Sequence, residues 1–323
     1  MAAMTGDPLR PRPTDHAFLG RDPRGASGEA TYAGALSFMR RPYSRDLAGV
    51  DCVVWGVPFD AAVSNRPGSR FGPQAIRRAS AIFDNDPQYP FRAFPFERLA
   101  TVDYGDCVFD YGRPWEVHAC IHAQATDILA AGAHLFTLGG DHSITYALLK
   151  AHAERHGPLA LVQFDAHQDT WDDDGERIDH GSFVLRAARE GLIRPEASIQ
   201  IGIRTHAPHD CGIEIIHGED MDHLGIAGVA ARIAARVGAA PAYMTFDIDC
   251  LDPAFAPGTG TPVAGGLSSR EALGILKRAG ALIDFVGGDI VEVAPPYDHA
   301  DITAIAAATV AQTYLGALAA RRG

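Results

Sequence analysis

The sequence lacks the marks of several protein classes. Its cysteines are few and widely spaced, with no C-x-x-C pair, so neither a disulfide framework nor a zinc ribbon is expected. The first 44 residues contain no apolar segment of the kind found in signal peptides, and we expect no later run to be long enough to span a bilayer. We therefore expect a cytoplasmic protein with no membrane partner. The five cysteines are Cys52, Cys107, Cys120, Cys211 and Cys250.

Basic residues are also scarce. Lys and Arg together number 28 against 40 Asp and Glu, which gives a formal net charge of −12 at pH 7. This balance argues against a nucleic-acid partner and favours cationic small molecules. The composition is otherwise that of an ordinary soluble globular protein, with 47% hydrophobic and 21% charged residues.

No internal repeat, low-complexity tract or linker divides the 323 residues, so we predict a single domain (46–323) after a partly ordered N-terminal arm (1–45). From residue 51 onward short apolar strands alternate with helical patterns, which is typical of an α/β fold with a parallel sheet covered by helices on both faces. About eight strands are predicted, at 51–57, 100–103, 134–138, 161–164, 198–203, 213–216, 242–246 and 285–293. Helices are predicted at 74–80, 117–131, 143–156, 226–237, 268–279 and 301–320.

Acidic residues and histidines follow three of the predicted strands, at the point where each strand ends. The carboxyl ends of parallel strands meet at one edge of a sheet, where binding sites form. In an extended chain, residues i and i+2 point the same way, so the segments 165–169 and 247–249 can both aim their side chains into one pocket. The candidate metal ligands are His142, Asp165, His167, Asp169, Asp247 and Asp249.

Four carboxylates with two imidazoles and no thiolate suit Mn²⁺, with Fe, Co or Zn as alternatives, and are enough to hold two divalent cations by bridging. A single aspartate is more often a helix cap, and a single histidine more often a core residue, than a ligand. The convergence of six such residues at three strand ends nevertheless favours a metal site with two cations.

Three motifs carry a resemblance to a known family. They are Gly-Gly-Asp-His-Ser at 139–143, Asp-Ala-His-Gln-Asp at 165–169, and Phe-Asp-Ile-Asp-Cys-Leu-Asp-Pro at 246–253. Together they resemble the metal motifs of the ureohydrolase family of arginases, agmatinases and related guanidino-compound hydrolases, from about residue 55 to the C-terminus. The segments 56–60, 255–262 and 291–298 make the chain most similar to bacterial agmatinases.

The resemblance implies a three-layer αβα fold, of the kind shared by arginases and deacetylases, around a parallel sheet of eight strands. It also implies a homotrimer or homohexamer, and two Mn²⁺ per subunit. One cation would be held by His142, Asp165, Asp169 and Asp247, the other by Asp165, His167, Asp247 and Asp249. Agmatinases usually carry threonine where this chain has Gln168, whose side chain we expect to point away from the ligands.

The resemblance also implies the reaction. A guanidinium carbon is a poor electrophile, so hydroxide must be made on the enzyme, and two cations can lower the pKa of water from 15.7 towards about 7 and hold the hydroxide between them. Glu292 lies at the end of another predicted strand, where a carboxylate can accept the planar guanidinium in two parallel hydrogen bonds. His180 stands where the family carries a histidine that transfers protons near the substrate.

These residues predict hydrolysis of agmatine to putrescine and urea, with guanidinobutyrate or guanidinopropionate as alternative substrates. Asp172, Asp173, Asp174 and Glu176 precede His180 and could favour the distal ammonium group of agmatine, although a solvated loop is the rival interpretation. A non-catalytic homologue is a further alternative, which the complete set of candidate ligands disfavours.

Overall fold

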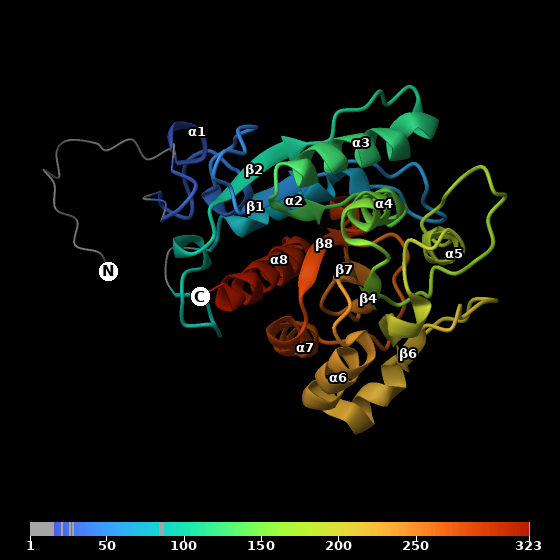
Figure 1. Cartoon of the computed structure of the whole chain (residues 1–323). Helices are drawn as coiled ribbons and strands as arrows, with labels where there is room; N and C mark the ends of the chain where they lie inside the picture. Colours follow the sequence, from blue (N-terminus) through green and yellow to red (C-terminus); the bar gives the residue numbers. More distant parts are fainter. Residues whose placement is uncertain (1–15, 21, 26, 28, 84–86, 323) are drawn as a thin grey trace, which may run out of the picture.

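A computed structural model describes residues 16–20, 22–25, 27, 29–83 and 87–322 (Figure 1). Within them the chain forms one sheet of eight strands, all parallel, in the order β2-β1-β3-β8-β7-β4-β5-β6. The strands are β1 (Cys52–Gly56), β2 (Thr101–Asp106), β3 (His134–Leu138), β4 (Ala160–Phe164), β5 (Ile199–Ile203), β6 (Glu214–His217), β7 (Ala242–Asp247) and β8 (Phe285–Val291). The predicted α/β fold with an eight-stranded parallel sheet is confirmed.

Helices cover both faces of the sheet and make the outer two of three layers (Figure 1). One face is covered by α3 (Val117–Ala130), α4 (Ile144–His156) and α5 (Phe183–Arg189), and the other by α2 (Gly72–Ser80), α6 (Met221–Val237), α7 (Ser269–Leu282) and α8 (Ile302–Arg321). A short helix, α1 (His16–Leu19), precedes them. Helix α5 was not predicted, because seven residues are too few for a helical pattern to stand out.

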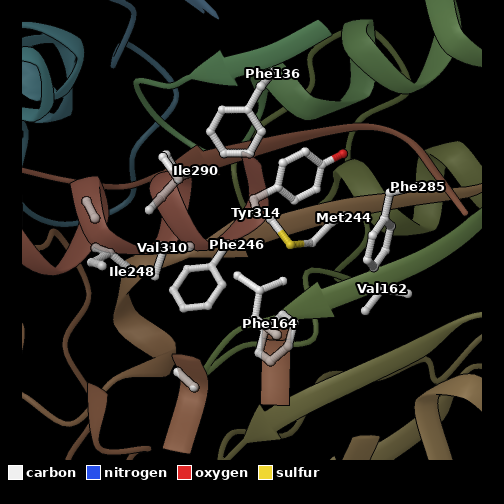
Figure 2. Packing of buried hydrophobic residues seen from close by; sticks show 14 of the residues in the cluster. Phe136, Val162, Phe164, Met244, Phe246, Ile248, Phe285, Ile290, Val310 and Tyr314 are labelled. Carbon is white, nitrogen blue, oxygen red and sulfur yellow. The ribbon is translucent and has the colours of Figure 1, made fainter. Parts of the chain in front are cut away.

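The strand side chains alternate between two hydrophobic cores. In β7, Met244 and Phe246 point to the same core as Val310 and Tyr314 of α8 (Figure 2). Tyr243 joins the core on the opposite face. Both faces are therefore buried, which explains why the strands were predicted from continuous apolar runs rather than from alternation. Each buried Phe or Met contributes about 1.5–3 kcal/mol to stability.

Helix α8 corrects one expectation from the sequence. Among the described residues it is the one helix long and apolar enough to cross a membrane by length and hydropathy, contrary to the expectation that no run would reach this length. However, 67% of its most apolar 18-residue segment is buried inside the fold, where Tyr314, Leu315 and neighbouring alanines pack in the core. Its apolar character is thus accounted for by packing against the sheet and α7.

The strand order brings four strands from distant parts of the chain to the middle of the sheet. The chain lays down β1, β2 and β3 on one side and β4, β5 and β6 on the other, and then returns to insert β7 and β8 between β3 and β4. Such a reversal of direction is where open parallel sheets place binding sites, beyond the carboxyl ends of the strands.

The described part of the predicted N-terminal arm contacts this domain. Phe38 and Met39 are buried in the core beside α2, and the Phe38 N–H donates to Asp103 of β2 at 2.7 Å. The guanidinium of Arg41 lies 4.1 Å from the ring centroid of Phe96. Residues 1–15, also assigned to the arm, lie outside the described residues.

Candidate metal centre

Three of the four central strands, β3, β4 and β7, bring all six predicted ligands together. His142 follows β3, Asp247 ends β7 and Asp249 follows it, and the remaining three follow β4. Their ligand atoms form two groups, each with atoms within 4.8 Å of one another: His142, Asp165 and Asp169 in one, and Asp165, His167 and Asp249 in the other. Asp165 is common to both groups.

The first group surrounds one ring nitrogen of His142. Its Nδ1 lies 3.1 Å from Asp165 Oδ2, 3.0 Å from Asp169 Oδ2 and 3.2 Å from Asp247 Oδ2. This buried nitrogen makes no hydrogen bond within the described part of the chain, while Nε2 lies 2.8 Å from the Thr245 hydroxyl. A lone pair facing three carboxylates is unfavourable unless a positive charge lies between them, so these residues fit a divalent cation.

The second group lies on the other side of Asp165. His167 Nδ1 is 3.1 Å from Asp249 Oδ2 and 3.5 Å from Asp165 Oδ1, so the two oxygens of Asp165 face different histidines. The second oxygen of Asp247, Oδ1, accepts the Asp249 N–H at 2.8 Å. Asp165 therefore belongs to both candidate groups, with one oxygen turned towards each.

The local backbone differs from the prediction. The ligands were expected on extended chain, where i and i+2 side chains share a direction, but Asp169 has a left-handed φ of 52° and residues 248–250 form a 3-10 turn. Beyond the strand ends the hydrogen-bond ladder no longer holds the chain extended. The prediction that the side chains converge is right, and the reason given for it is wrong.

The concentration of negative charge changes the pKa values of the ligands. Burial disfavours the charged ring of His167, yet Asp249 and Asp165 outweigh it and raise its pKa to about 12. Burial, reinforced by the charge of Asp165, raises the pKa of Asp169 to about 7. Protons and cations therefore compete for the same groups, as is general for metal sites.

Beneath His142 a buried carboxylate fixes the orientation of its ring. The Thr245 hydroxyl donates to Asp289 Oδ1 at 2.6 Å, and the hydroxyls of Tyr243 and Thr145 donate to Asp289 Oδ2 at 2.8 and 2.9 Å. Because Thr245 uses its proton on Asp289, it accepts from His142 Nε2, and Nδ1 is left to face the carboxylates. Thr245 and Asp289 were not among the predicted site residues, although both are polar residues within apolar strands.

Glu292 lies directly after β8 and borders the same site. Its φ is 62°, so β8 ends at Val291, two residues before the predicted end. Glu292 Oε1 accepts the His142 N–H at 2.9 Å and pairs with His180 Nδ1 at 3.0 Å. Oε2 is buried and makes no hydrogen bond to any described residue. One oxygen is thus already bound by the protein and the other has no partner among the described residues, so the two parallel hydrogen bonds expected from the sequence would need Oε1 to give up a protein contact.

His180 is fixed at both ring nitrogens. Its Nδ1 faces Glu292, and its Nε2 lies 2.9 Å from the Ser64 N–H and 2.7 Å from the Ser64 hydroxyl. Burial disfavours the charged ring, but Glu292 outweighs it and raises the pKa of His180 to about 9. On protonation Nε2 becomes a donor, which the Ser64 hydroxyl can accept and the Ser64 N–H cannot. Ser64 lies in a loop 116 residues away from His180, so no local sequence pattern linked the two residues.

Two other aspartates hold loops. Asp141 accepts the Ala62 N–H at 2.9 Å and the Ser143 N–H at 3.0 Å, and so links the loop after β1 to the start of α4. Asp252 accepts the N–H groups of Gly265 and Gly266. Neither has a hydrogen bond to a candidate ligand side chain among the described residues, so both hold loops rather than orient the candidate ligands.

The acidic loop before His180 is neutralised by its neighbours. Asp172 pairs with Arg189 at 3.0 Å, Asp173 with Arg186 at 2.7 Å, and Asp174 with Arg177 at 2.8 Å. Carboxylates paired in this way offer little net charge to a substrate ammonium group. The structure therefore favours the rival interpretation, a solvated loop.

Comparison of the sequence and the structure with known proteins identifies the family of this chain. The sequence profile of the arginase family matches residues 50–316. The chain belongs to the arginase family. It is 53% identical to the agmatinase of Chromobacterium violaceum over 89% of each chain. The solved structure of a hypothetical agmatinase from Burkholderia thailandensis is similar with a TM-score of 0.93 at 51% identity, covering 95% of this chain and 97% of that chain.

A second solved member of similar shape is proclavaminate amidino hydrolase from Streptomyces clavuligerus. It gives a TM-score of 0.82 at 40% identity and covers 90% of this chain and 99% of that chain. The predicted membership of the ureohydrolase family, most similar to agmatinases, is confirmed. The arginase-family metal residues are present and lie within contact distance of one another.

Proposed function

We propose that the protein is an agmatinase-type ureohydrolase that converts agmatine and water into putrescine and urea. The C–N bond between the guanidinium carbon and the aliphatic nitrogen breaks, water supplies the urea oxygen, and the departing nitrogen leaves as an ammonium group. The observation that carries the proposal is the unpaired, buried Oε2 of Glu292 beside the His/Asp groups, where a planar guanidinium can be accepted.

Two Mn²⁺ ions per chain are part of this proposal. His142, Asp165, Asp169 and Asp247 would hold one, and Asp165, His167, Asp247 and Asp249 the other, with the two oxygens of Asp165 supporting a bridging role. The chemistry that such cations supply when bound is an activated water molecule, because coordination lowers the pKa of water from 15.7 towards about 7.

The side chains around the cations have separate tasks. Glu292 accepts a guanidinium N–H through Oε2 while Oε1 stays bound to the His142 N–H and His180. With its pKa raised to about 9, His180 is protonated at neutral pH and can give its proton to the departing amine nitrogen. Ser64 keeps Nε2 of His180 in place until then.

The choice of agmatine rests on the relatives, of which the one named above, an agmatinase, is 53% identical over 89% of the chain. A second candidate is a guanidino acid, because a proclavaminate amidino hydrolase is similar in structure at 40% identity. The acidic loop does not favour agmatine over a guanidino acid as the substrate, since its three aspartates are paired with arginines.

Urea release from a panel of guanidino compounds tests the proposal. The protein is loaded with Mn²⁺ and offered agmatine, guanidinobutyrate, guanidinopropionate and arginine at equal concentration. Agmatine should give the highest kcat/KM. A preference for a guanidino acid would keep the chemistry and change the substrate, and the absence of urea with every compound would indicate a non-catalytic homologue.

We further propose that the protein is cytoplasmic and forms a homotrimer or homohexamer. All five cysteines lie within the described residues and are free, as a reducing compartment permits. Val108, Tyr111 and Trp115, between β2 and α3, are 69%, 89% and 74% exposed, which supports a subunit contact there. Light scattering of the purified protein would measure the number of subunits.

A further inference from the structure

Two buried glutamines lie side by side beneath the metal ligands. Gln163 on β4 is paired in register with Gln200 on β5, and neither side chain is exposed to solvent. Both interrupt strands that are otherwise almost entirely apolar. A buried amide costs free energy unless it is hydrogen-bonded, so the partners of these two side chains indicate what they do.

The two amides form a chain that ends on the metal ligands. Gln200 Nε2 donates to Gln163 Oε1 at 2.8 Å, and Gln163 Nε2 donates to Asp165 Oδ2 at 2.7 Å. Gln163 Nε2 also lies 3.4 Å from Asp169 Oδ2. Because a carboxylate only accepts, Gln163 must present its NH₂ group to Asp165, and its oxygen must then face the NH₂ group of Gln200.

Gln200 also holds the backbone of the ligand loop. Its Nε2 donates to the main-chain oxygen of Gln168 at 2.7 Å, immediately before Asp169 with its left-handed φ of 52°. A non-glycine residue in this region needs support from its surroundings. The side chain of Gln168 accepts the Ala207 N–H at 2.7 Å and so points away from the ligands, as expected from the sequence.

We propose that Gln200 and Gln163 are positioning residues for the metal centre. Through this chain, β5 fixes the rotamer of Asp165, the residue common to both ligand groups, and the backbone that directs Asp169 towards His142. The chain donates only neutral N–H groups, so it orients the carboxylates without competing for their negative charge as a cationic side chain would. The inference deepens the proposed function, on whose metal site it rests.

The test compares Gln200→Met with wild type. Methionine has a similar length and flexibility but no donor, so packing is kept while both hydrogen bonds are lost. Gln88→Met is the matched control, because Gln88 is also a buried glutamine, 4% exposed, whose Nε2 donates to a main-chain oxygen, that of Gln312, away from the metal ligands.

Binding of Mn²⁺ to the metal-free proteins is measured by calorimetric titration, and Co²⁺-loaded samples are compared by visible absorption. Gln200→Met should bind Mn²⁺ about 10- to 100-fold more weakly than wild type, the range typical for groups that orient metal ligands. Its Co²⁺ spectrum should shift, while Gln88→Met keeps wild-type affinity and spectrum. Gln163→Met, which removes the bond to Asp165 directly, should behave like Gln200→Met and serves if that variant does not fold.

Equal Mn²⁺ affinity and an unchanged Co²⁺ spectrum in a folded Gln200→Met or Gln163→Met protein would overturn the inference. So would an equal loss of affinity in Gln88→Met, which would point to general destabilisation. Agmatine is not used in this experiment. If the wild-type protein binds Mn²⁺ here but releases no urea in the separate test with guanidino compounds, the proposed function is wrong and the inference about Gln200 and Gln163 is unaffected.

Discussion

At the scale of single residues, the metal centre depends on which nitrogen or oxygen of a side chain faces it. His142 presents Nδ1 because Nε2 is bound to Thr245, and Glu292 presents Oε2 because Oε1 is bound to His142 and His180. In both cases the protein satisfies one end of the side chain and leaves the other for a ligand. In the proposed function, this division separates the residues that would hold cations from those that would contact the substrate.

The separation predicts different losses in two variants. Asp249→Ala removes a carboxylate 3.1 Å from His167 Nδ1 and should lose the second cation together with nearly all activity. His180→Ala should keep both cations and lose mainly kcat, by about 10²–10⁴-fold, the usual contribution of a general acid. Metal analysis of the two purified proteins checks this, and a full metal complement in Asp249→Ala would contradict the ligand assignment.

The pair of His180 and Glu292 predicts a pH dependence of stability. Glu292 raises the pKa of His180 to about 9 against the opposing effect of burial, whereas in the unfolded chain the pKa is about 6.5. The folded state therefore binds the proton more tightly, and the resulting stability is fully present below about pH 6.5 and lost as the pH rises through about 9.

Denaturation of metal-free wild type and His180→Asn between pH 6 and 10 measures this. The stability advantage of wild type should be largest at the acid end and shrink as the pH approaches 10. An advantage that stays constant across the range would show that the proton on His180 contributes nothing to folding.

The residues predicted from the sequence share one property, which is that they lie in recognisable local motifs. The six candidate ligands, Glu292 and His180 were all predicted in this way. Ser64, Thr245 and Asp289 were missed because each acts through a contact to a residue distant in the chain, such as the 116 positions between Ser64 and His180. No local pattern marks such contacts.

At the scale of elements, the turns after the strands position the candidate metal ligands more directly than the strands themselves do. The turn after β3 crosses closely over the segment after β1, and the Asp141 N–H donates to the Phe59 oxygen at 2.8 Å. A Cβ on Gly140 would overlap that same oxygen. Only glycine allows this approach, which places His142 over the site.

Gly140→Ala should therefore destabilise the fold or displace His142, because the obstacle is backbone that cannot move aside. We expect weaker Mn²⁺ binding by about 10-fold or more, as for other changes that misorient ligands. Gly112→Ala is the control, since its Cβ would meet only the Asp110 side chain at 3.2 Å in an exposed loop. Wild-type metal affinity in Gly140→Ala would show that the close approach is not required.

The same scale shows why the extended-chain argument failed. Apolar runs located all eight strands, but the site lies in the turns beyond them, where Asp169 and Glu292 adopt left-handed backbone conformations. These conformations depend on the surrounding contacts, such as the bond from Gln200 to the residue before Asp169. Strand propensity alone does not predict them.

At the scale of the whole molecule, the N-terminal arm and the sheet form one packing unit in the described residues. We propose that residues 46–323 form the catalytic domain and that the arm stabilises it through Phe38, which is fully buried. Phe38→Ala should lower the free energy of unfolding by about 3–5 kcal/mol, the usual cost of truncating a buried aromatic ring.

Tyr32→Ala is the matched control in the same arm, because Tyr32 is 92% exposed and its loss should change stability by less than about 0.5 kcal/mol. Chemical denaturation of both variants measures the difference. If Phe38→Ala and Tyr32→Ala are equally stable, the arm does not stabilise the domain through Phe38.

The architecture of the molecule was predicted from alternation of strands and helices and from the family resemblance. The order of strands was not, because it depends on β7 and β8 returning to the middle of the sheet, and pairings over such distances leave no trace in local sequence. That order is what gathers residues from four strands into a single centre.

The most direct test of the account measures bound Mn²⁺ and agmatine hydrolysis in the same preparation. Metal-free protein is titrated with Mn²⁺, and bound metal per chain and urea release are recorded at each step. We predict no activity without metal and full activity only as binding approaches two ions per chain. Urea release that is complete at one ion, or that does not depend on added metal, would contradict a centre in which two ligand groups act together.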